Sequence, residues 1–494
     1  MSRTGRASKH IGGSPACWIL WGVGALSITT FTACATRVPQ VLTPQLIPPA
    51  FNGHTMPPDR IWPQPQWWTD FGSMELSELI ARAEADNRDL AVAAARVLAA
   101  QARRAVEQSV LFPQVTAQAQ ATRSSPSSVQ AGHSQGPAAE NAFKMSAAAS
   151  YELDVWGQQL ASVRAASEQL KSAHFAQRAV ALTLTANVAN TYFTLLTLRQ
   201  RTAIANEDVT AINGLLDVIK LRVATGSASH LDLAREQAQI EAVKAQLPLL
   251  QERELETRVA LAVLLGKVPE SFAVNEATAA EIRIPEVGPG LPSDLLSRRP
   301  DVAQAEANLA AAHANLDAAR AAFLPQFSLT GDAGYASTTA GALFRGPNFI
   351  WDAGAGLLQT LFDGGKLLGQ KRLAAATQQE LVAAYQSSVL NAYADVETAL
   401  GQVTGNRIAE DHLQREISAA REAFDIAQLQ YRQGAADLLI VLQAQQTLFD
   451  ARDQLAQIRL ARLQSAVHLY EALGGGWIES AGDRTQFLTQ SLEQ

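Results

Sequence analysis

Four stretches of the chain alternate apolar and polar residues with a period of two. The stretches are residues 114–122, 143–155, 326–335 and 351–357. In the second of them, every other residue from Phe143 to Val155 is apolar or aromatic. This alternation predicts β-strands whose two faces meet different solvents. Polar stretches rich in Gly, Ser and Pro, at residues 124–141 and 337–348, join the members of each pair and predict surface loops.

A second period, of three and four residues, predicts long helices. Residues 159–223 contain no proline, and apolar residues near the end of this stretch recur at helical spacing. At 1.5 Å per residue, roughly 65 residues make a rod of roughly 100 Å, which indicates a coiled coil or a helical tube. Gly226 and Gly434 follow two such stretches, and we expect each to adopt the left-handed conformation that ends a helix. Return helices are predicted from Leu231 toward Leu265 and from Leu438 to Leu473.

The chain also contains an internal duplication. Asn87 to Leu90, an alanine-rich helix and Pro113-Gln114 recur 212 residues later as Arg299 to Val302, a second alanine-rich helix and Pro325-Gln326. Gly226 and Gly434 are 208 residues apart, so the hairpins repeat as well. Self-similarity on this scale indicates one structural unit used twice. We expect two structural repeats, each a helix, two strands and a long hairpin, at 69–265 and 293–473, a Pro/Gly-rich connector at 266–292 and a loose polar tail at 474–494.

Residues 1–33 have the pattern of an export signal. Three basic residues precede an apolar stretch that is shorter than a typical membrane-spanning helix. Thr32-Ala33 before Cys34 resembles the box at which bacterial lipoproteins are cut and lipidated, although Phe31 stands where Leu is usual. We expect a lipid anchor on Cys34, with an ordinary signal peptide and an incidental cysteine as the alternative. The proline-rich residues 34–68 predict an extended tether.

Composition and charge exclude several classes of function. Loss of the signal removes three basic residues and no acid, which moves the net charge from −7 to −10 and argues against a nucleic-acid partner. The eight histidines are scattered without metal-ligand spacing, and no P-loop, HExxH or GxSxG motif occurs. We therefore expect no catalytic residue, no metal and no cofactor other than the covalent lipid on Cys34.

The number of predicted strands sets a constraint on assembly. Four strands cannot close a membrane barrel, and lipid tolerates no exposed strand edge, so several copies of the chain would have to share one barrel. Two copies give eight strands with a filled interior, and three give twelve strands with a lumen. The long helices favour the hollow arrangement. The strands taken alone fit a soluble antiparallel sandwich equally well.

Several long segments carry a family resemblance: WWTDFGSMELSELIARAEADNRDL, GLPSDLLSRRPDVAQAEANLAAAHANL, ARAAFLPQFSLTG and LLQTLFDGG. They resemble the TolC-type outer-membrane efflux factors, specifically the lipoprotein, NodT-like branch that serves tripartite RND-type efflux systems. The resemblance covers nearly everything from Trp67 to Leu473. It implies an α+β fold, in which a homotrimer forms a twelve-stranded transmembrane β-barrel, four strands per chain, continued by a twelve-helix periplasmic α-barrel of long coiled-coil helices.

The resemblance also implies a function. Such proteins are passive exit ducts, often in multidrug resistance, for molecules expelled by an inner-membrane pump through a periplasmic adaptor. They lie in the outer membrane and extend into the periplasm. Two other interpretations remain open: a lipid-anchored periplasmic coiled-coil scaffold without a pore, and a periplasmic enzyme with an undetected site.

The same resemblance points to residues near the hairpin tips. Asp232 and Tyr431 match the family positions whose hydrogen bond holds the periplasmic aperture closed. The alternative is that Tyr431 is an aromatic that packs in its hairpin and Asp232 a solvated acid at a helix N-terminus. Ile440 and Gln443 stand where many members carry an aspartate at the constriction, and Ala436 stands where some carry arginine. A more neutral aperture is therefore expected. Contact with the adaptor would fall on the hairpin tips, at Thr225, Gly226, Ser227, Gln433, Gly434 and Ala435.

Overall fold

The computed structural model describes residues 51, 64–125, 139–275, 279, 282–287 and 295–476. All of them belong to one unit of the chain, Leu42–Gln494. The expected export signal and Cys34 lie outside the described residues, as do most of the expected tether and most of the expected tail.

The duplication is confirmed, because the two halves of the chain contain helices of equal length in the same order. Each half has a 22-residue helix, two strands, a 67-residue helix and a 35-residue helix. In the first half these are α2 (Arg88–Ser109), β1 (Gln114–Ser124), β2 (Glu140–Leu153), α4 (Gln158–Ala224) and α5 (His230–Leu264). In the second they are α7 (Pro300–Ala321), β3 (Gln326–Ser337), β4 (Phe349–Leu358), α8 (Lys366–Arg432) and α9 (Leu438–Ala472). Before the first half lie η2 (Trp67–Phe71) and α1 (Met74–Asp86), and three short 3-10 helices occupy connections, at η3 (Pro269–Ser271), η5 (Ala340–Ala342) and η6 (Gly346–Asn348).

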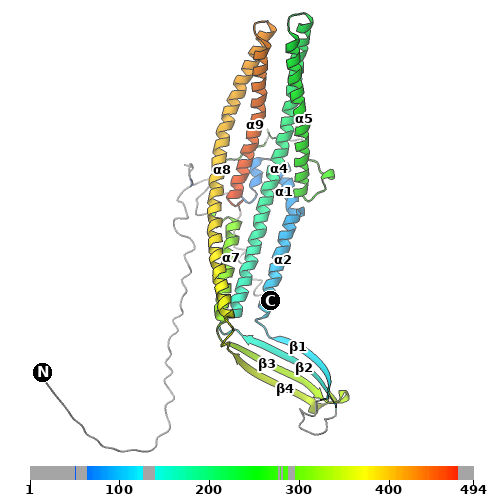
Figure 1. Ribbon diagram of the computed structural model, residues 1–494, viewed down its shortest axis with the longest axis vertical. Coiled ribbons are helices and arrows are strands. Elements are labelled where there is room, and N and C mark those ends of the chain that lie inside the picture. The colour runs from blue at the N-terminus through cyan, green and yellow to red at the C-terminus, as the bar shows by residue number, and fades with distance from the viewer. Residues whose placement is uncertain are drawn as a thin grey trace, which may run out of the picture. The chain divides into compact units, whose positions relative to one another are not determined.

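The four strands form one antiparallel sheet in the order β1-β2-β3-β4 (Figure 1). Its register brings the alternating apolar residues of all four strands onto one face. One cross-strand row is Ala117, Ala147, Ala333 and Trp351. Within the described part of the chain, β1 and β4 pair on one side only and no helix packs on either face of the sheet. The soluble-sandwich alternative was therefore wrong, because a sandwich requires a second layer against one face.

Aromatic side chains gather at both ends of this sheet. Trp156 and Phe327 lie 6.5 Å apart at one end, and Tyr335 lies 5.5 Å from Phe349 at the other. Tyr335 follows Phe327 by eight positions on β3, about 27 Å of extended strand. An apolar band of about 25 Å between two aromatic girdles is the pattern of an outer-membrane barrel.

The long helices form two hairpins, α4/α5 and α8/α9, which lead away from the sheet (Figure 1). The hairpins meet along α4 and α9, and α7 packs between α4 and α8. At 1.5 Å per residue, the 67 residues of α4 span about 100 Å, in agreement with the length predicted for this helix. One stretch of α4 is apolar enough to cross a membrane, but half of it is buried against the rest of the chain, as in a core helix.

The largest core lies where α1, η2, α4, α5 and the end of α9 meet. Trp67, Phe71, Tyr192, Phe193 and Tyr470 are buried there, and the Trp67 and Tyr470 rings stack at 5.0 Å. Apolar side chains of the connector at 266–292 join the same core: Phe272, Val274, Ala279 and Ile282. The described part of the connector therefore packs against the core of the chain.

Candidate periplasmic aperture at the hairpin tips

Both hairpin tips end in the same backbone motif. Gly226 and Gly434 have φ angles of 76° and 73°, the left-handed conformation expected from the sequence. At the first tip, the Ser227 N–H donates to the Arg222 carbonyl at 2.8 Å; at the second, the Ala435 N–H donates to the Gln430 carbonyl at 2.9 Å. These are the closing bonds of a Schellman motif, which satisfies the last carbonyls of a helix. The expected adaptor-contact residues flank the two glycines and are exposed: Thr225, Gly226, Ser227, Gln433, Gly434 and Ala435.

The expected bond between Asp232 and Tyr431 is absent. The Asp232 carboxylate accepts instead from the N–H and the hydroxyl of Ser229, at 3.0 and 2.8 Å, and forms a capping box at the start of α5. The Tyr431 hydroxyl is buried and has no hydrogen-bond partner among the described residues. Burial is the largest cause of the raised pKa of Tyr431, and the nearby charges of Arg222 and Asp232 act in opposite directions. Both capping bonds use Oδ2 of Asp232, and they hold this carboxylate at the start of its own helix.

Arg222 makes the contact between the two hairpins at this level. Its Nη1 donates to the Tyr431 carbonyl at 2.7 Å, and its guanidinium carbon lies 4.5 Å from the centre of the Tyr431 ring. The cation thus caps the last turn of α8, where the helix dipole favours positive charge, and covers an aromatic face. A hydrogen bond from a charged group of this kind contributes about 2 kcal/mol. Arg222 was not among the residues singled out from the sequence.

The remaining residues expected at the aperture lie on the first turns of α9. Ile440 is half exposed and Gln443 is exposed in the single chain, while Ala436 is partly buried. Neither Ile440 nor Gln443 has an ionisable side chain, so these two positions provide no carboxylate that could bind a cation. No cluster of three or more His, Cys, Asp or Glu side chains suited to a metal occurs among the described residues.

Further from the tips, two arginines join α4 to α9. Arg201 binds the Asp453 carboxylate through two bonds of 2.6 and 3.0 Å. Arg452 binds Asp208 at 2.9 Å and also contacts Glu207. Asp208 is buried, and this burial raises its pKa to about 6 although Arg452 opposes the shift. These reciprocal pairs place one arginine on each hairpin and hold the hairpins side by side.

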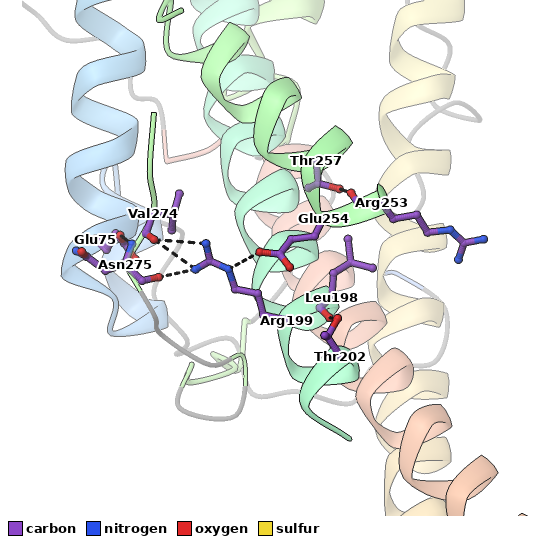
Figure 2. A network of polar contacts seen from close by, with 9 residues as sticks. All are labelled: Glu75, Leu198, Arg199, Thr202, Arg253, Glu254, Thr257, Val274 and Asn275. Atoms are coloured by element: carbon purple, nitrogen blue, oxygen red, sulfur yellow. Dashed lines mark hydrogen bonds and ion pairs between the residues drawn. The ribbon is translucent and has the colours of Figure 1, made fainter. Parts of the chain in front are cut away.

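At the other end of the hairpins, the connector is fastened by a second polar network, shown in Figure 2. Arg199 on α4 binds Glu254 on α5 at 3.0 Å and donates to the Asn275 carbonyl at 2.7 Å. The Asn275 N–H donates to Glu75 on α1 at 2.8 Å, and Glu75 also accepts from the Tyr192 hydroxyl at 2.9 Å. This end of the hairpins is therefore fixed by charge, hydrogen bonds and the aromatic core. The tips have fewer such attachments.

Comparison with known proteins identifies relatives over nearly the whole described chain. The family described as outer membrane efflux protein matches residues 79–267 and 291–475. The pyoverdine export outer membrane protein OpmQ of Pseudomonas aeruginosa is 39% identical over 417 residues, which are 83% of this chain and 87% of that protein. The cation efflux system protein CusC of Escherichia coli is 30% identical over 417 residues, 83% of this chain and 88% of that protein.

Solved structures are similar over the same extent. The outer-membrane channel OprN has a TM-score of 0.82 at 27% identity, and the match covers 88% of this chain and 98% of that one. A structure of CusC has a TM-score of 0.79 at 28% identity, covering 87% of this chain and 97% of that one. Both the order of elements and their geometry are therefore shared with these proteins.

Proposed function

Since this chain belongs to the outer membrane efflux protein family and is the outer-membrane channel of a tripartite efflux system, we propose that it is the passive exit duct for small molecules delivered by an inner-membrane RND-type pump through a periplasmic adaptor. Channels of this family are trimers in efflux pumps, lie in the outer membrane and extend into the periplasm, and they are not enzymes. The pump supplies the energy, and this chain supplies the path.

The open four-stranded sheet is the observation that carries this proposal. β1 and β4 have no partner on their outer sides within the described chain, and both faces of the sheet are uncovered. Three copies joined edge to edge give twelve strands, which is wide enough for a lumen. The hairpins that continue from each sheet then supply twelve long helices around the same axis.

We place the adaptor contact at the hairpin tips. The exposed tip residues around Gly226 and Gly434 are small, so they allow an adaptor to approach the backbone closely. Cys34 would carry a covalent lipid that holds the N-terminus in the membrane. No other cofactor is needed, because transport through a duct requires no chemistry on the cargo.

The aperture would be held closed by contacts between the two hairpins. Tyr431 and Asp232 lie at this level, and the Arg222 contact with the Tyr431 carbonyl is a polar link between α4 and α8 beside their apolar contact. Ile440 and Gln443 would line the narrow end as neutral groups. Opening would separate the tips while the aromatic core at the other end of the hairpins stays packed.

The cargo is set by the pump, and the relatives suggest its class. Two pyoverdine export proteins are 39% and 37% identical to this chain, whereas relatives named for toluene, antibiotic or cation efflux are 30 to 32% identical. We therefore favour a secreted siderophore-type metabolite over a solvent or a metal ion.

Single-channel recording on the purified protein in planar bilayers tests the duct directly. We expect discrete conductance steps. The alternative of a poreless scaffold predicts a silent membrane at every protein concentration. A strain that lacks the gene should retain siderophore in its cells and recover secretion when the gene is restored; unchanged secretion would contradict the assignment of cargo.

A further inference from the structure

The core between the two hairpins near their tips is divided into two apolar clusters. The tip cluster is Leu215, Ile219, Ala427, Tyr431, Leu438 and Val441. The shaft cluster lies next to it, further from the tips. It consists of Ile212, Ile240, Val243, Ala420, Leu448 and Phe449. Leu233 packs against the tip cluster, and Phe424 packs against both. Both clusters contain residues of the two hairpins, so they are the apolar contact that keeps the tips together.

Two polar side chains lie between these clusters. Glu236 on α5 stands between Leu233 and Ile240 and is 0% exposed. Gln445 on α9 stands between Val441 and Leu448 and is 1% exposed. Each lies three or four residues from apolar core positions, and its burial places it on the core face of its helix. They form a polar layer in an otherwise apolar contact between the hairpins.

Three buried polar side chains at this level lack hydrogen-bond partners in the described chain, although the Gln239 amide beside them donates to Gln446. Both carboxylate oxygens of Glu236, both amide atoms of Gln445 and the hydroxyl of Tyr431 have no hydrogen-bond partner among the described residues. A buried carboxylate without a partner is far more costly when ionised than when protonated. Burial accordingly raises the pKa of Glu236 to about 7, and it is the one cause of that shift.

Among the described residues, no charged group contributes to the shift in the pKa of Glu236. On α5, its neighbour Arg235 is exposed and Asp232 caps the start of the helix. Arg222 on α4 is bound to the Tyr431 carbonyl, and Arg452 on α9 is bound to Asp208 and Glu207. The charged residues of α8 near the tip are exposed: Arg421, Glu422, Asp425 and Arg432.

We propose that Glu236 makes the periplasmic aperture responsive to protons: with its carboxyl group protonated the hairpin tips stay packed, and loss of that proton loosens them. This inference rests on the proposed function, because it assigns a regulator to the same aperture. The second hairpin has no equivalent group, since the residue 208 positions after Glu236 is Ala444. The proton-sensitive element therefore belongs to the α4/α5 hairpin.

The direction of the effect follows from proton linkage. A loosened tip would hydrate Glu236, so its carboxyl group would titrate near the ordinary value of 4.5, whereas the packed tip keeps its proton up to about pH 7. The packed tip therefore binds more protons between these values and loses stability as the pH rises through them. Each pH unit in that window changes the ratio of loosened to packed tips by at most about tenfold per chain.

Two measurements on the full-length trimer test the proposal. Single-channel conductance is recorded from pH 5 to pH 8.5 for the wild type, for Glu236→Gln and for the control Glu241→Gln, whose glutamate is exposed and paired with Lys244 on the same helix. In parallel, spin labels on Ser227→Cys and Ala435→Cys, introduced into each of these backgrounds, report the distance between the two tips. Glutamine is close to glutamate in size and carries no titrating proton.

We expect the wild type and Glu241→Gln to gain conductance and tip separation as the pH rises from 5 to 7.5. Glu236→Gln should stay in the packed, low-conductance state across the whole range. A pH response of Glu236→Gln equal to that of the wild type would overturn the proposal. Absence of conductance steps in every variant would contradict the duct function, while the spin-label distances would still report whether Glu236 controls the tips.

Discussion

Helices α2 and α7 occupy equivalent places in the two repeats. Helix α7 is covered by other helices on two sides, whereas α2 is covered on one. Both have 22 residues, and they begin 212 positions apart, at Arg88 and Pro300. α7 packs against α4 and α8 and buries eight residues, whereas α2 packs against α4 and buries two, Ala93 and Val97. The same helix is thus fully packed in the second repeat and only partly packed in the first.

The exposed side of α2 carries several large apolar residues. Val92, Leu98 and Val106 are each at least half exposed in the single chain. β1, which follows α2, likewise has no partner on its outer side within the described chain. A second copy placed beside α2 and β1 would cover both surfaces at once, in the way that α8 covers the second side of α7. We therefore propose that α2 and β1 form the contact with the neighbouring copy.

The largest effect is expected from a charge on the open side of α2. Leu98→Asp would place a carboxylate in the contact between copies, where its burial without a partner is costly. We expect loss of the trimer in size-exclusion chromatography with light scattering, and loss of efflux with it. The matched control is Gln101→Asp on the same helix, at an exposed polar position. Trimers that survive Leu98→Asp unchanged would show that α2 is not the contact.

A second substitution distinguishes the role of the tips in efflux from the role of α2 in trimer formation. Gly226→Trp or Gly434→Trp puts a bulky side chain at a left-handed position on the exposed tip, where other residues are strained by about 1–2 kcal/mol. We expect efflux to be lost while trimers persist, because we place the adaptor contact at the tips and the contact between copies at α2. Asparagine tolerates the left-handed conformation, so Gly226→Asn should keep most of the efflux. Normal efflux in both tryptophan variants would remove the tips from the adaptor contact.

A smaller effect is expected at the link between the hairpins. Arg222→Ala removes the bond to the Tyr431 carbonyl and the contact with its ring. A loss of about 2 kcal/mol would change the ratio of open to closed tips by a factor of about 30 per chain, and mean single-channel conductance should rise. Arg432→Ala, an exposed arginine in the last turn of α8, is the control and should leave conductance unchanged.

The strands and the long helices could be predicted because their signals are local, and the duplication because the two repeats still share those signals in the same order. The period-two stretches are the strands of the sheet, and the hairpin glycines have the conformation that their position requires. The capping box at Ser229 and Asp232 also had a local signal, a serine three residues before an acid at a helix start. The family resemblance instead predicted a bond from Tyr431 to Asp232. In the structure, Asp232 binds Ser229.

The contacts between the hairpins could not be predicted in the same way. Arg222 and Tyr431 are 209 positions apart, and nothing in the sequence around either residue indicates the pairing. Glu236 lies next to Gln237, and the sequence alone does not determine which of the two faces the core. Packing of α5 against α4, α8 and α9 decides it, since Glu236 is buried and Gln237 is exposed.

Native mass spectrometry of the detergent-extracted protein tests the central claim most directly, that one chain is a third of a closed tube. We predict a complex with the mass of three mature chains, and no smaller species that retains the β-sheet signal in circular dichroism. A single chain that stays folded in water, with its sheet intact, would contradict the account.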